Sequence, residues 1–396
     1  MMMAVVRRSS FYVRRSTNNT RGRSHVARRT FLLAIFLLSV SVVPGAQAPA
    51  ASDGWPQFRG NRHLTGVTAS APPAVLKLVW KLDVGESIDS SAAIVDGTVY
   101  VGSSTGDLVA VDLASGKLRW KYSAGSPIGE SSPAVAREMV FVGDSAGVLH
   151  AVRTRDGSRA WTFKTAQEIK SSPVVVDALV LIGSYDGHLY ALDAGTGALR
   201  WKFATDGPVH ATPAVQDGVA FVAGCDERVR AISLADGREQ YHIVAGANTA
   251  ASPVIGGGRV YVGTFNNEVL AIDLRGRKIA WRYENPDRQF PFYSSAALAN
   301  GRVIVGSRDK LLHAIDAVTG KLVWSFATRA RVDSSPAVAG GRVYVGSSDG
   351  RLYVLDAASG QKRWEFDTGS ALTASPAIAA GRVVIGSTDG VLYCFG

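Results

Sequence analysis

The sequence predicts an all-β fold, an eight-bladed β-propeller whose blades are four-stranded antiparallel sheets. The first observation is a period of 40 to 43 residues between aromatic residues, at Trp80, Trp120, Trp161, Trp201, Tyr241, Trp281, Trp324 and Trp364. The second is a series of eight markers in step with it, in which Ser or Thr precedes Pro or Ala, from Ser91-Ala92 to Ser375-Pro376. Units that repeat in phase at this length stack on one another and bury a continuous core.

Residues 1–50 predict a signal peptide that precedes the fold. Eight Arg residues lie before an apolar run from Phe31 to Val43, and Ala46-Gln47-Ala48 supplies small residues for cleavage. Arg28-Arg29 resembles the twin-arginine export motif, although the general secretory route also fits. The apolar run is shorter than the roughly twenty residues of a spanning helix, so an uncleaved anchor is the alternative. We expect a periplasmic or secreted protein whose mature chain has no transmembrane span.

The basic charge of the chain comes from this leader. It holds eight of the 43 Lys and Arg residues and none of the 33 acidic residues, which leaves a net charge of about +2 on the remainder. That remainder has no run of Lys or Arg, which is the electrostatic signature of a nucleic-acid-binding protein. We therefore expect no nucleic-acid partner.

Each repeat predicts four strands, here called A to D from the channel outward. In the clearest unit they are expected at Ser335–Val338, Val343–Gly346, Leu352–Asp356 and Arg363–Phe366. Asp349-Gly350 and Ser359-Gly360 separate the last three, because Gly supplies the positive φ that tight hairpin turns need. Strands B and C are nearly continuous apolar runs, as expected for sheets that are covered on both faces.

The two ends of the repeat region predict how the ring closes. The propeller is expected to span residues 78–396, after a lead-in segment at residues 51–77. The chain enters on a D strand, Leu78–Leu82, and leaves on a C strand, Leu392–Phe395. Only the first D strand can complete the last blade, so we expect the N-terminal D strand to join the C-terminal blade.

One repeated segment resembles a known motif. Asp112–Trp120 reads Asp-Leu-Ala-Ser-Gly-Lys-Leu-Arg-Trp and recurs at Asp193–Trp201, Asp316–Trp324 and Asp356–Trp364. It is similar to the tryptophan-docking motif of pyrroloquinoline-quinone (PQQ) repeat proteins, and Trp55–Asn61 resembles the segment that precedes the propeller in many of them. The resemblance covers residues 55–396 and implies a quinoprotein-type propeller. The Gly-His and Trp-Asp signatures of WD40 repeats are absent.

The resemblance leaves two classes of function open. Members of the family include dehydrogenases that hold PQQ with calcium, and non-enzymatic proteins that are similar to the outer-membrane assembly factor BamB. The enzymes carry adjacent cysteines over the quinone and long excursions between blades, whereas this chain has no Cys-Cys pair and short connections. The Glu, Asn and Asp set around calcium also has no counterpart that can be carried over.

We therefore expect a non-enzymatic, BamB-like binding scaffold without a catalytic residue, a metal site or a cofactor. Its expected partner is a protein or peptide of the cell envelope, and the chain is expected to be a monomer. A PQQ-dependent dehydrogenase or quinone-binding protein is the first alternative, and an extracytoplasmic sensor is the second. Fold alone does not decide among them.

One position differs from blade to blade, two residues before each Ser or Thr marker. We expect these residues to form a ring at one mouth of the channel, where the resemblance places the quinone of the enzymes. The ring is the candidate ligand or cofactor site and consists of Asp89, Glu130, Lys170, His210, Ala250, Tyr293, Asp333 and Thr373. The alternative is that these residues are solvated and unconstrained.

The connection from Glu284 to Tyr293 is longer than its counterparts and accounts for the 43-residue spacing. Aromatic residues and Arg are enriched at binding hot spots. The loop is therefore the candidate partner contact, through Arg288, Phe290, Phe292 and Tyr293. The alternative is a lid that packs over the channel.

The two cysteines are expected to remain unpaired. Cys225 and Cys394 fall on blades that lie opposite each other in an eight-membered ring, too far apart for a disulfide. Cys394 occupies a C-strand position that is Ala in most other blades. We expect it to be a small core residue.

Overall fold

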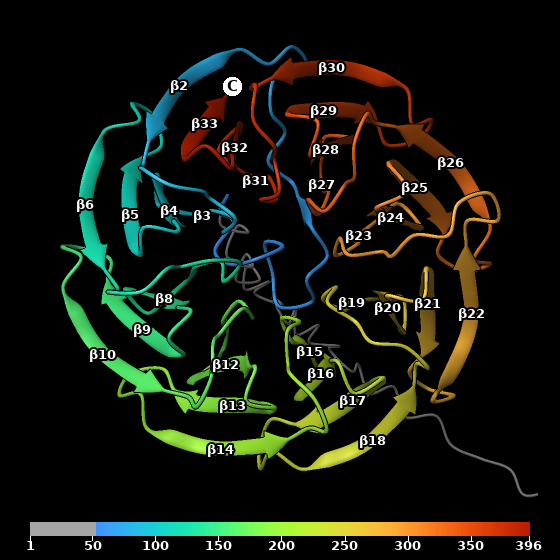
Figure 1. Cartoon of the computed structure of the whole chain (residues 1–396), viewed down its shortest axis with the longest axis horizontal. Coiled ribbons are helices and arrows are strands. Elements are labelled where there is room, and N and C mark those ends of the chain that lie inside the picture. The colour runs from blue at the N-terminus through green and yellow to red at the C-terminus, as the bar shows by residue number, and fades with distance from the viewer. Residues whose placement is uncertain (1–52) are drawn as a thin grey trace, which may run out of the picture. The chain divides into compact units, whose positions relative to one another are not determined.

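The computed structural model describes residues 53–396, and every regular element in this range is a β-strand. The strands form eight sheets arranged in a ring around a central channel (Figure 1). The four strands of each blade form an antiparallel meander with the A strand shortest and innermost among them, which confirms the predicted eight-bladed fold. No helix in this range could cross a membrane. The predicted signal peptide lies outside the described residues.

The first four blades each consist of four consecutive strands. Blade 1 contains β3 (Ala93–Val95), β4 (Thr98–Gly102), β5 (Asp107–Asp112) and β6 (Leu118–Ser123). Blade 2 contains β7 (Ala134–Ala136), β8 (Met139–Gly143), β9 (Val148–Arg153) and β10 (Arg159–Lys164). Blade 3 contains β11 (Val174–Val176), β12 (Leu179–Ser184), β13 (His188–Asp193) and β14 (Leu199–Ala204). Blade 4 contains β15 (Ala214–Gln216), β16 (Val219–Ala223), β17 (Arg228–Ser233) and β18 (Glu239–Val244).

The other four blades follow the same order, except that the last is completed from the N-terminal side. Blade 5 contains β19 (Val254–Gly256), β20 (Arg259–Gly263), β21 (Glu268–Asp273) and β22 (Lys278–Glu284). Blade 6 contains β23 (Ala297–Ala299), β24 (Arg302–Gly306), β25 (Leu311–Asp316) and β26 (Leu322–Ala327). Blade 7 contains β27 (Ala337–Ala339), β28 (Arg342–Gly346), β29 (Arg351–Asp356) and β30 (Lys362–Asp367). Blade 8 contains β31 (Ala377–Ala379), β32 (Arg382–Gly386), β33 (Val391–Phe395) and β2 (Leu78–Asp83).

The innermost strands are shorter than predicted. The A strand of blade 7 was expected to begin at Ser335, but β27 begins at Ala337, after Pro336. Proline has no N–H to donate to a strand ladder, so pairing starts only beyond it.

The closure of the ring is confirmed. Strand β2 pairs antiparallel with β33, and Trp80 lies opposite Cys394. The N-terminal strand thus supplies the fourth strand of blade 8, which ties the two ends of the propeller together by backbone hydrogen bonds. Cys394 is buried in this blade, and both cysteines are free.

The period of aromatic residues arises from a contact between neighbouring blades. The Trp80 indole N–H donates to the Leu113 carbonyl at 2.9 Å, and its ring packs on Gly116, where a Cβ would lie 2.7 Å away. The indoles of five further blades bond in the same way to the next blade, at Trp120, Trp161, Trp201, Trp281 and Trp324. Six of the eight repeats therefore carry a Trp side chain that docks on the following repeat through a hydrogen bond.

The lead-in occupies the channel, which the sequence did not predict. It runs across the middle of the ring (Figure 1), and β1 (Val67–Thr68) pairs in parallel with β27 on its inner edge. Trp55 forms a two-way backbone bridge with Ile94 of blade 1. Carbonyls of the lead-in accept inner-edge N–H groups from blades 2, 4, 5, 6 and 7, at Val135, Val215, Ile255, Leu298 and Val338. The inner edges of the A strands are therefore largely paired.

Candidate functional site

The eight Ser and Thr markers form a closed ring of hydrogen bonds around the channel. Each hydroxyl accepts the backbone N–H of the corresponding residue in the preceding blade, at 2.9 to 3.0 Å. The last bond, from the Ser375 N–H to the Ser91 hydroxyl, joins blade 8 to blade 1. A hydroxyl is needed at every marker because it replaces a ladder partner that the innermost strand lacks.

A pocket of about 420 Å³ opens above this ring. All eight residues of the predicted mouth ring line it, as does Phe58 of the lead-in. Because the lead-in crosses the channel, the cavity is a cup that is closed below and not an open bore. We call it the mouth cup.

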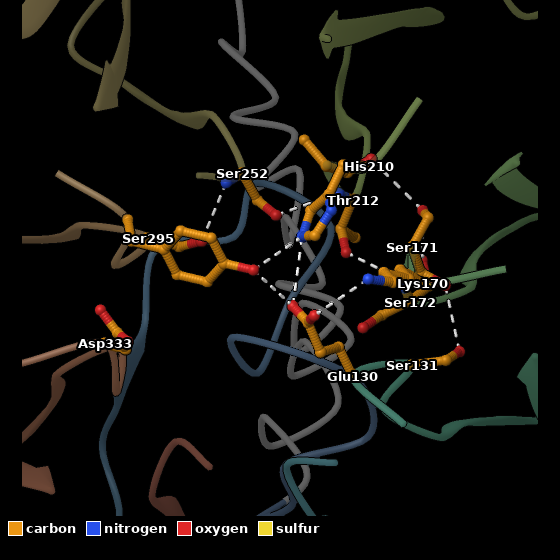
Figure 2. Close-up of polar contacts among 12 residues, drawn as sticks. Glu130, Ser131, Lys170, Ser171, Ser172, His210, Thr212, Ser252, Ser295 and Asp333 are labelled. Atoms are coloured by element: carbon orange, nitrogen blue, oxygen red, sulfur yellow. Dashed lines mark hydrogen bonds and ion pairs between the residues drawn. The ribbon is translucent and has the colours of Figure 1, made fainter. Parts of the chain in front are cut away.

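Four residues of the mouth cup form one hydrogen-bonded cluster. Glu130 of blade 2 accepts the Tyr293 hydroxyl of blade 6, directly across the ring, at 2.8 Å. His210 Nε2 lies 3.2 Å from the same carboxylate and 3.3 Å from the Tyr293 hydroxyl. Lys170 Nζ lies 3.8 Å from the other oxygen of Glu130 (Figure 2). These polar side chains therefore extend across the mouth of the channel. We call Glu130, Lys170, His210 and Tyr293 the cross-mouth cluster.

A second layer holds this cluster in place. The Tyr185 hydroxyl lies 2.5 Å from His210 Nδ1, and Lys170 lies over the Tyr185 ring. On the opposite side, Arg308 stacks over the Tyr293 ring at 4.5 Å. Burial, followed by the charge of Glu130, raises the pKa of Tyr293 well above its usual value, so its hydroxyl remains a hydrogen-bond donor.

The remaining acidic residues of the ring have different surroundings. Asp333 accepts Arg308 and Arg331, each at 2.9 Å. Asp89 accepts the hydroxyls of Thr373 at 2.7 Å and Ser87 at 3.1 Å. Within residues 53–396, no cationic side chain lies within ion-pair distance of Asp89. The two acids thus lie in a half of the cup that the cross-mouth cluster does not fill.

The charge of Glu130 is maintained by its neighbours. Burial raises the pKa of this carboxyl. Its hydrogen bonds with His210 and Tyr293 and the positive charges of His210 and Lys170 outweigh burial and lower the pKa to about 2. A carboxyl whose pKa is lower in the folded than in the unfolded state stabilises the fold above the unfolded value of 4.5. This stabilisation is lost as the pH falls toward 2.

We predict that Glu130→Gln removes this acid-sensitive stabilisation. The side chain is 37% exposed, so solvent screening limits the effect to about 1 kcal/mol. The variant should be less stable than the wild type at pH 7, and the gap should close between pH 4.5 and pH 2.5. Urea unfolding across this range measures it, with Glu86→Gln at an exposed site as the control. A gap that stays constant with pH would contradict the prediction.

The structure separates the four predicted contact residues of the Glu284–Tyr293 loop. Tyr293 turns into the mouth cup. Phe290 is 48% exposed, and Arg288 is also exposed while donating to the Asp309 carbonyl. Phe292 is only 2% exposed and packs on Gly263, where a Cβ would lie 2.7 Å from its side chain. The prediction of Phe292 as a surface contact is therefore wrong, because it fills the apolar position that Val332 fills in the next blade.

The residues of the second layer were not predicted from the sequence. They come from the turn between strands B and C. In every blade they follow by two residues a Gly or Ala near the end of strand B. That position is small in blades 1, 2, 7 and 8 but carries Tyr185, Cys225, Phe265 and Arg308 in blades 3 to 6. Comparing this position between repeats, as was done for the mouth ring, would have found them.

The lead-in adds one more group, Arg59, which is 1% exposed. Its Nη2 donates to the Ala296 carbonyl at 3.0 Å, and its Nε and Nη1 have no partner in the described part of the chain. Burial lowers the pKa of this guanidinium to about 9, which still leaves it charged at neutral pH. The lead-in therefore places an uncompensated positive charge inside the ring.

Comparison with known proteins places this architecture in a family. The sequence profile described as "Outer membrane protein assembly factor BamB" matches residues 76–173, 145–290 and 275–395. The chain belongs to this BamB family of PQQ-repeat proteins. A search of curated protein sequences found no match.

Solved structures share the fold of this BamB-family chain at low sequence identity. BamB from Moraxella catarrhalis is 20% identical, with a TM-score of 0.71, over 81% of this chain and 99% of that chain. Quinohemoprotein alcohol dehydrogenase from Comamonas testosteroni is 15% identical, with a TM-score of 0.76, over 87% and 80%. A europium-containing methanol dehydrogenase is 14% identical, with a TM-score of 0.70, over 87% and 98%. The fold is thus common to BamB and to these two dehydrogenases.

Few carboxylate oxygens in the mouth cup of this BamB-family chain are free to bind a calcium ion. A Ca²⁺ site needs six to eight oxygen ligands directed at one point. Here the oxygens of Glu130 and Asp333 are engaged by cationic side chains, and within residues 53–396 no three acidic, His or Cys side chains are grouped as metal ligands. The polar groups of the mouth cup mainly form hydrogen bonds and ion pairs with one another.

Proposed function

We propose that this protein is an exported, non-enzymatic binding scaffold of the cell envelope, in which the mouth cup and the adjacent exposed loop receive a protein or peptide partner. Export is supported by the Arg-rich leader with its apolar run. A partner in the envelope is supported by membership of the family described as an outer membrane protein assembly factor.

The divergence of the blades at one mouth carries the proposal. The blades are alike in their strands, their docking aromatics and their hydroxyl ring, but they differ at both positions that surround the cup. There the side chains form a cluster spanning blades 2, 3, 4 and 6, with Arg308 stacked beside it. A set of polar groups held in place by second-layer contacts is pre-organised for binding, which lowers the entropic cost of association.

The exposed part of the Glu284–Tyr293 loop extends this surface. Phe290 and Arg288 are exposed on the segment that leads directly into Tyr293. Aromatic and Arg side chains at the centre of an interface contribute most of the binding energy. The loop and the cup are therefore proposed to contact the same partner.

Capture of partners from envelope extract tests the proposal. The purified wild type should retain a specific protein or peptide that the Glu130→Ala, Lys170→Ala, His210→Ala triple variant loses. Phe290→Ala should weaken capture by about tenfold or more, since hot-spot truncations cost about 2 kcal/mol. Phe292→Ala is the contrasting variant, because loss of a buried Phe lowers stability by about 3 kcal/mol while the contact surface remains.

A dye-reduction assay distinguishes the proposed scaffold from a quinone-dependent dehydrogenase. The purified protein would be incubated with PQQ and calcium and assayed with alcohols and sugars. A new absorbance band together with dye reduction would replace the scaffold proposal with a dehydrogenase. Capture that persists unchanged in both the triple variant and Phe290→Ala would place the partner surface elsewhere on the molecule.

A further inference from the structure

The floor of the mouth cup consists of hydrogen-bond donors without acceptors. Seven of the eight ring hydroxyls line the pocket, those of Ser91, Ser172, Thr212, Ser252, Ser295, Ser335 and Ser375. These residues are buried, and each hydroxyl oxygen accepts one backbone N–H. Their own hydrogens have no acceptor within the described residues. A hydroxyl both accepts and donates, so each of the seven retains a free donor at the floor.

The guanidinium of Arg59 is bonded beside the ring of hydroxyls, although Arg59 itself is buried and does not line the pocket. Its neighbour Phe58 lines the pocket, and its Nη2 bonds to the carbonyl of Ala296, the residue that follows ring residue Ser295. Its Nε and Nη1 have no acceptor. A buried cation without a partner is costly and attracts an anion.

The acids at the rim do not cancel this positive charge. Glu130 is engaged by His210 and Lys170, and Asp333 is engaged by two Arg residues. Asp89 is the one ring acid without an ion pair in residues 53–396, and its oxygens accept two hydroxyls. Three of the four carboxylates that line the pocket, those of Glu130, Glu168 and Asp333, therefore lie within ion-pair distance of a cationic side chain, and Glu130 and Glu168 share Lys170. Arg59 has no such partner among the described residues.

The closed end of the cup decides which part of a ligand can reach these donors. A chain cannot thread through the ring, because the lead-in is bonded to the inner edges of the blades. Only the end of a ligand can reach the floor. A group that offers several acceptor oxygens and one negative charge matches both the hydroxyls and the guanidinium.

We infer that the floor of the mouth cup binds a carboxylate, either the C-terminus of a peptide or a small organic acid. The inference rests on the proposed binding function and names the chemistry that the cup selects. The carboxylate oxygens accept hydrogens from the ring hydroxyls, while the buried guanidinium of Arg59 supplies the opposite charge.

Titration calorimetry of the full mature chain tests the inference with three probes. They are N-acetyl-trialanine with a free carboxylate, the same peptide as its C-terminal amide, and propionate. Binding of the acid at least about tenfold tighter than the amide is expected, because hydrogen bonds to a charged group are stronger than neutral ones. Propionate that binds as tightly as the peptide identifies a small organic acid as the ligand, and much weaker propionate binding identifies a peptide C-terminus.

Two variants assign the binding to the floor. Arg59→Met should weaken binding of the acid by about tenfold to a hundredfold and leave binding of the amide unchanged. Arg62→Met, at an exposed position in the same segment, is its control. Thr212→Val removes one ring hydroxyl with little change of side-chain shape. It should weaken binding of the acid by about threefold to tenfold. This second variant keeps the test decisive if Arg59→Met does not fold.

Equal affinity for acid and amide, or no binding of either at about 10 mM, would overturn the inference. The hydroxyls would then hold only water. If capture of an envelope partner nevertheless persists, the scaffold proposal stands and only the carboxylate assignment fails.

Discussion

Trp80→Ala is expected to lower the free energy of unfolding by about 3 to 5 kcal/mol, which is the usual cost of truncating a buried Trp. Trp80 joins two features that hold the ring together. It lies in the N-terminal strand that completes blade 8, opposite Cys394, and its indole bonds to Leu113 of blade 1. Its loss therefore weakens the closure and the docking of the next blade at once. Urea unfolding followed by tryptophan fluorescence and circular dichroism measures the change.

Lys81→Ala is the matched control for this prediction. Lys81 lies in the same strand, pairs with Tyr393 through the backbone and has an exposed side chain. Its truncation should change stability by no more than about 0.5 kcal/mol. Similar losses in the two variants would show that the strand contributes only its backbone and that the docking contact is unimportant.

Trp55→Ala is expected to lower the free energy of unfolding by about 3 to 5 kcal/mol and to loosen the attachment of the lead-in to the ring. Trp55 is buried and exchanges two backbone hydrogen bonds of 2.8 Å with Ile94, so it fixes the start of the lead-in on blade 1. Gly60 turns the chain against its ring, where a Cβ would lie only 3.0 Å away. Without the indole, the segment that closes the cup loses its main anchor.

Hydrogen exchange distinguishes loosening of the lead-in from general destabilisation. The amide of Val135 donates to the Pro56 carbonyl, next to Trp55, and should exchange faster in Trp55→Ala. The amide of Val383, in the ladder of blade 8, should change only with global stability. Arg62→Ala is the control, because its exposed side chain can be removed while its carbonyl still accepts the Val215 N–H. Equal changes at both amides would contradict the anchoring role.

The repeat made the fold and the closure predictable. Apolar strand runs, turn glycines and docking aromatics act within one blade or between adjacent blades. Each copy of the repeat therefore contains all the residues that specify one blade. The strands that contain Trp80 and Cys394 could be paired in advance, because only one D strand and one C strand were left without partners. The same reasoning located the mouth ring, since a position that recurs at a fixed place in every blade must form a circle.

The chemistry within the circle was not predictable in the same way. Glu130 and Tyr293 are 163 residues apart and meet across the channel, at a distance set by the ring diameter and by side-chain rotamers. Phe292 looked like a contact residue beside Phe290, yet strand packing places one in the core and leaves the other exposed. A neighbouring position in sequence does not fix the direction of a side chain in an irregular loop.

By itself, the sequence determined the number of blades, the strands in each, the closure and the ring of unlike residues at one mouth. All of these follow from local patterns repeated eight times. Only the tertiary structure decided that the lead-in closes the channel and that Arg59 is buried beside the ring of hydroxyls. The lead-in occurs once, and it is held mainly by backbone carbonyls that every residue possesses. Such contacts have no signature in the sequence, because they depend on where the finished ring leaves N–H groups without partners.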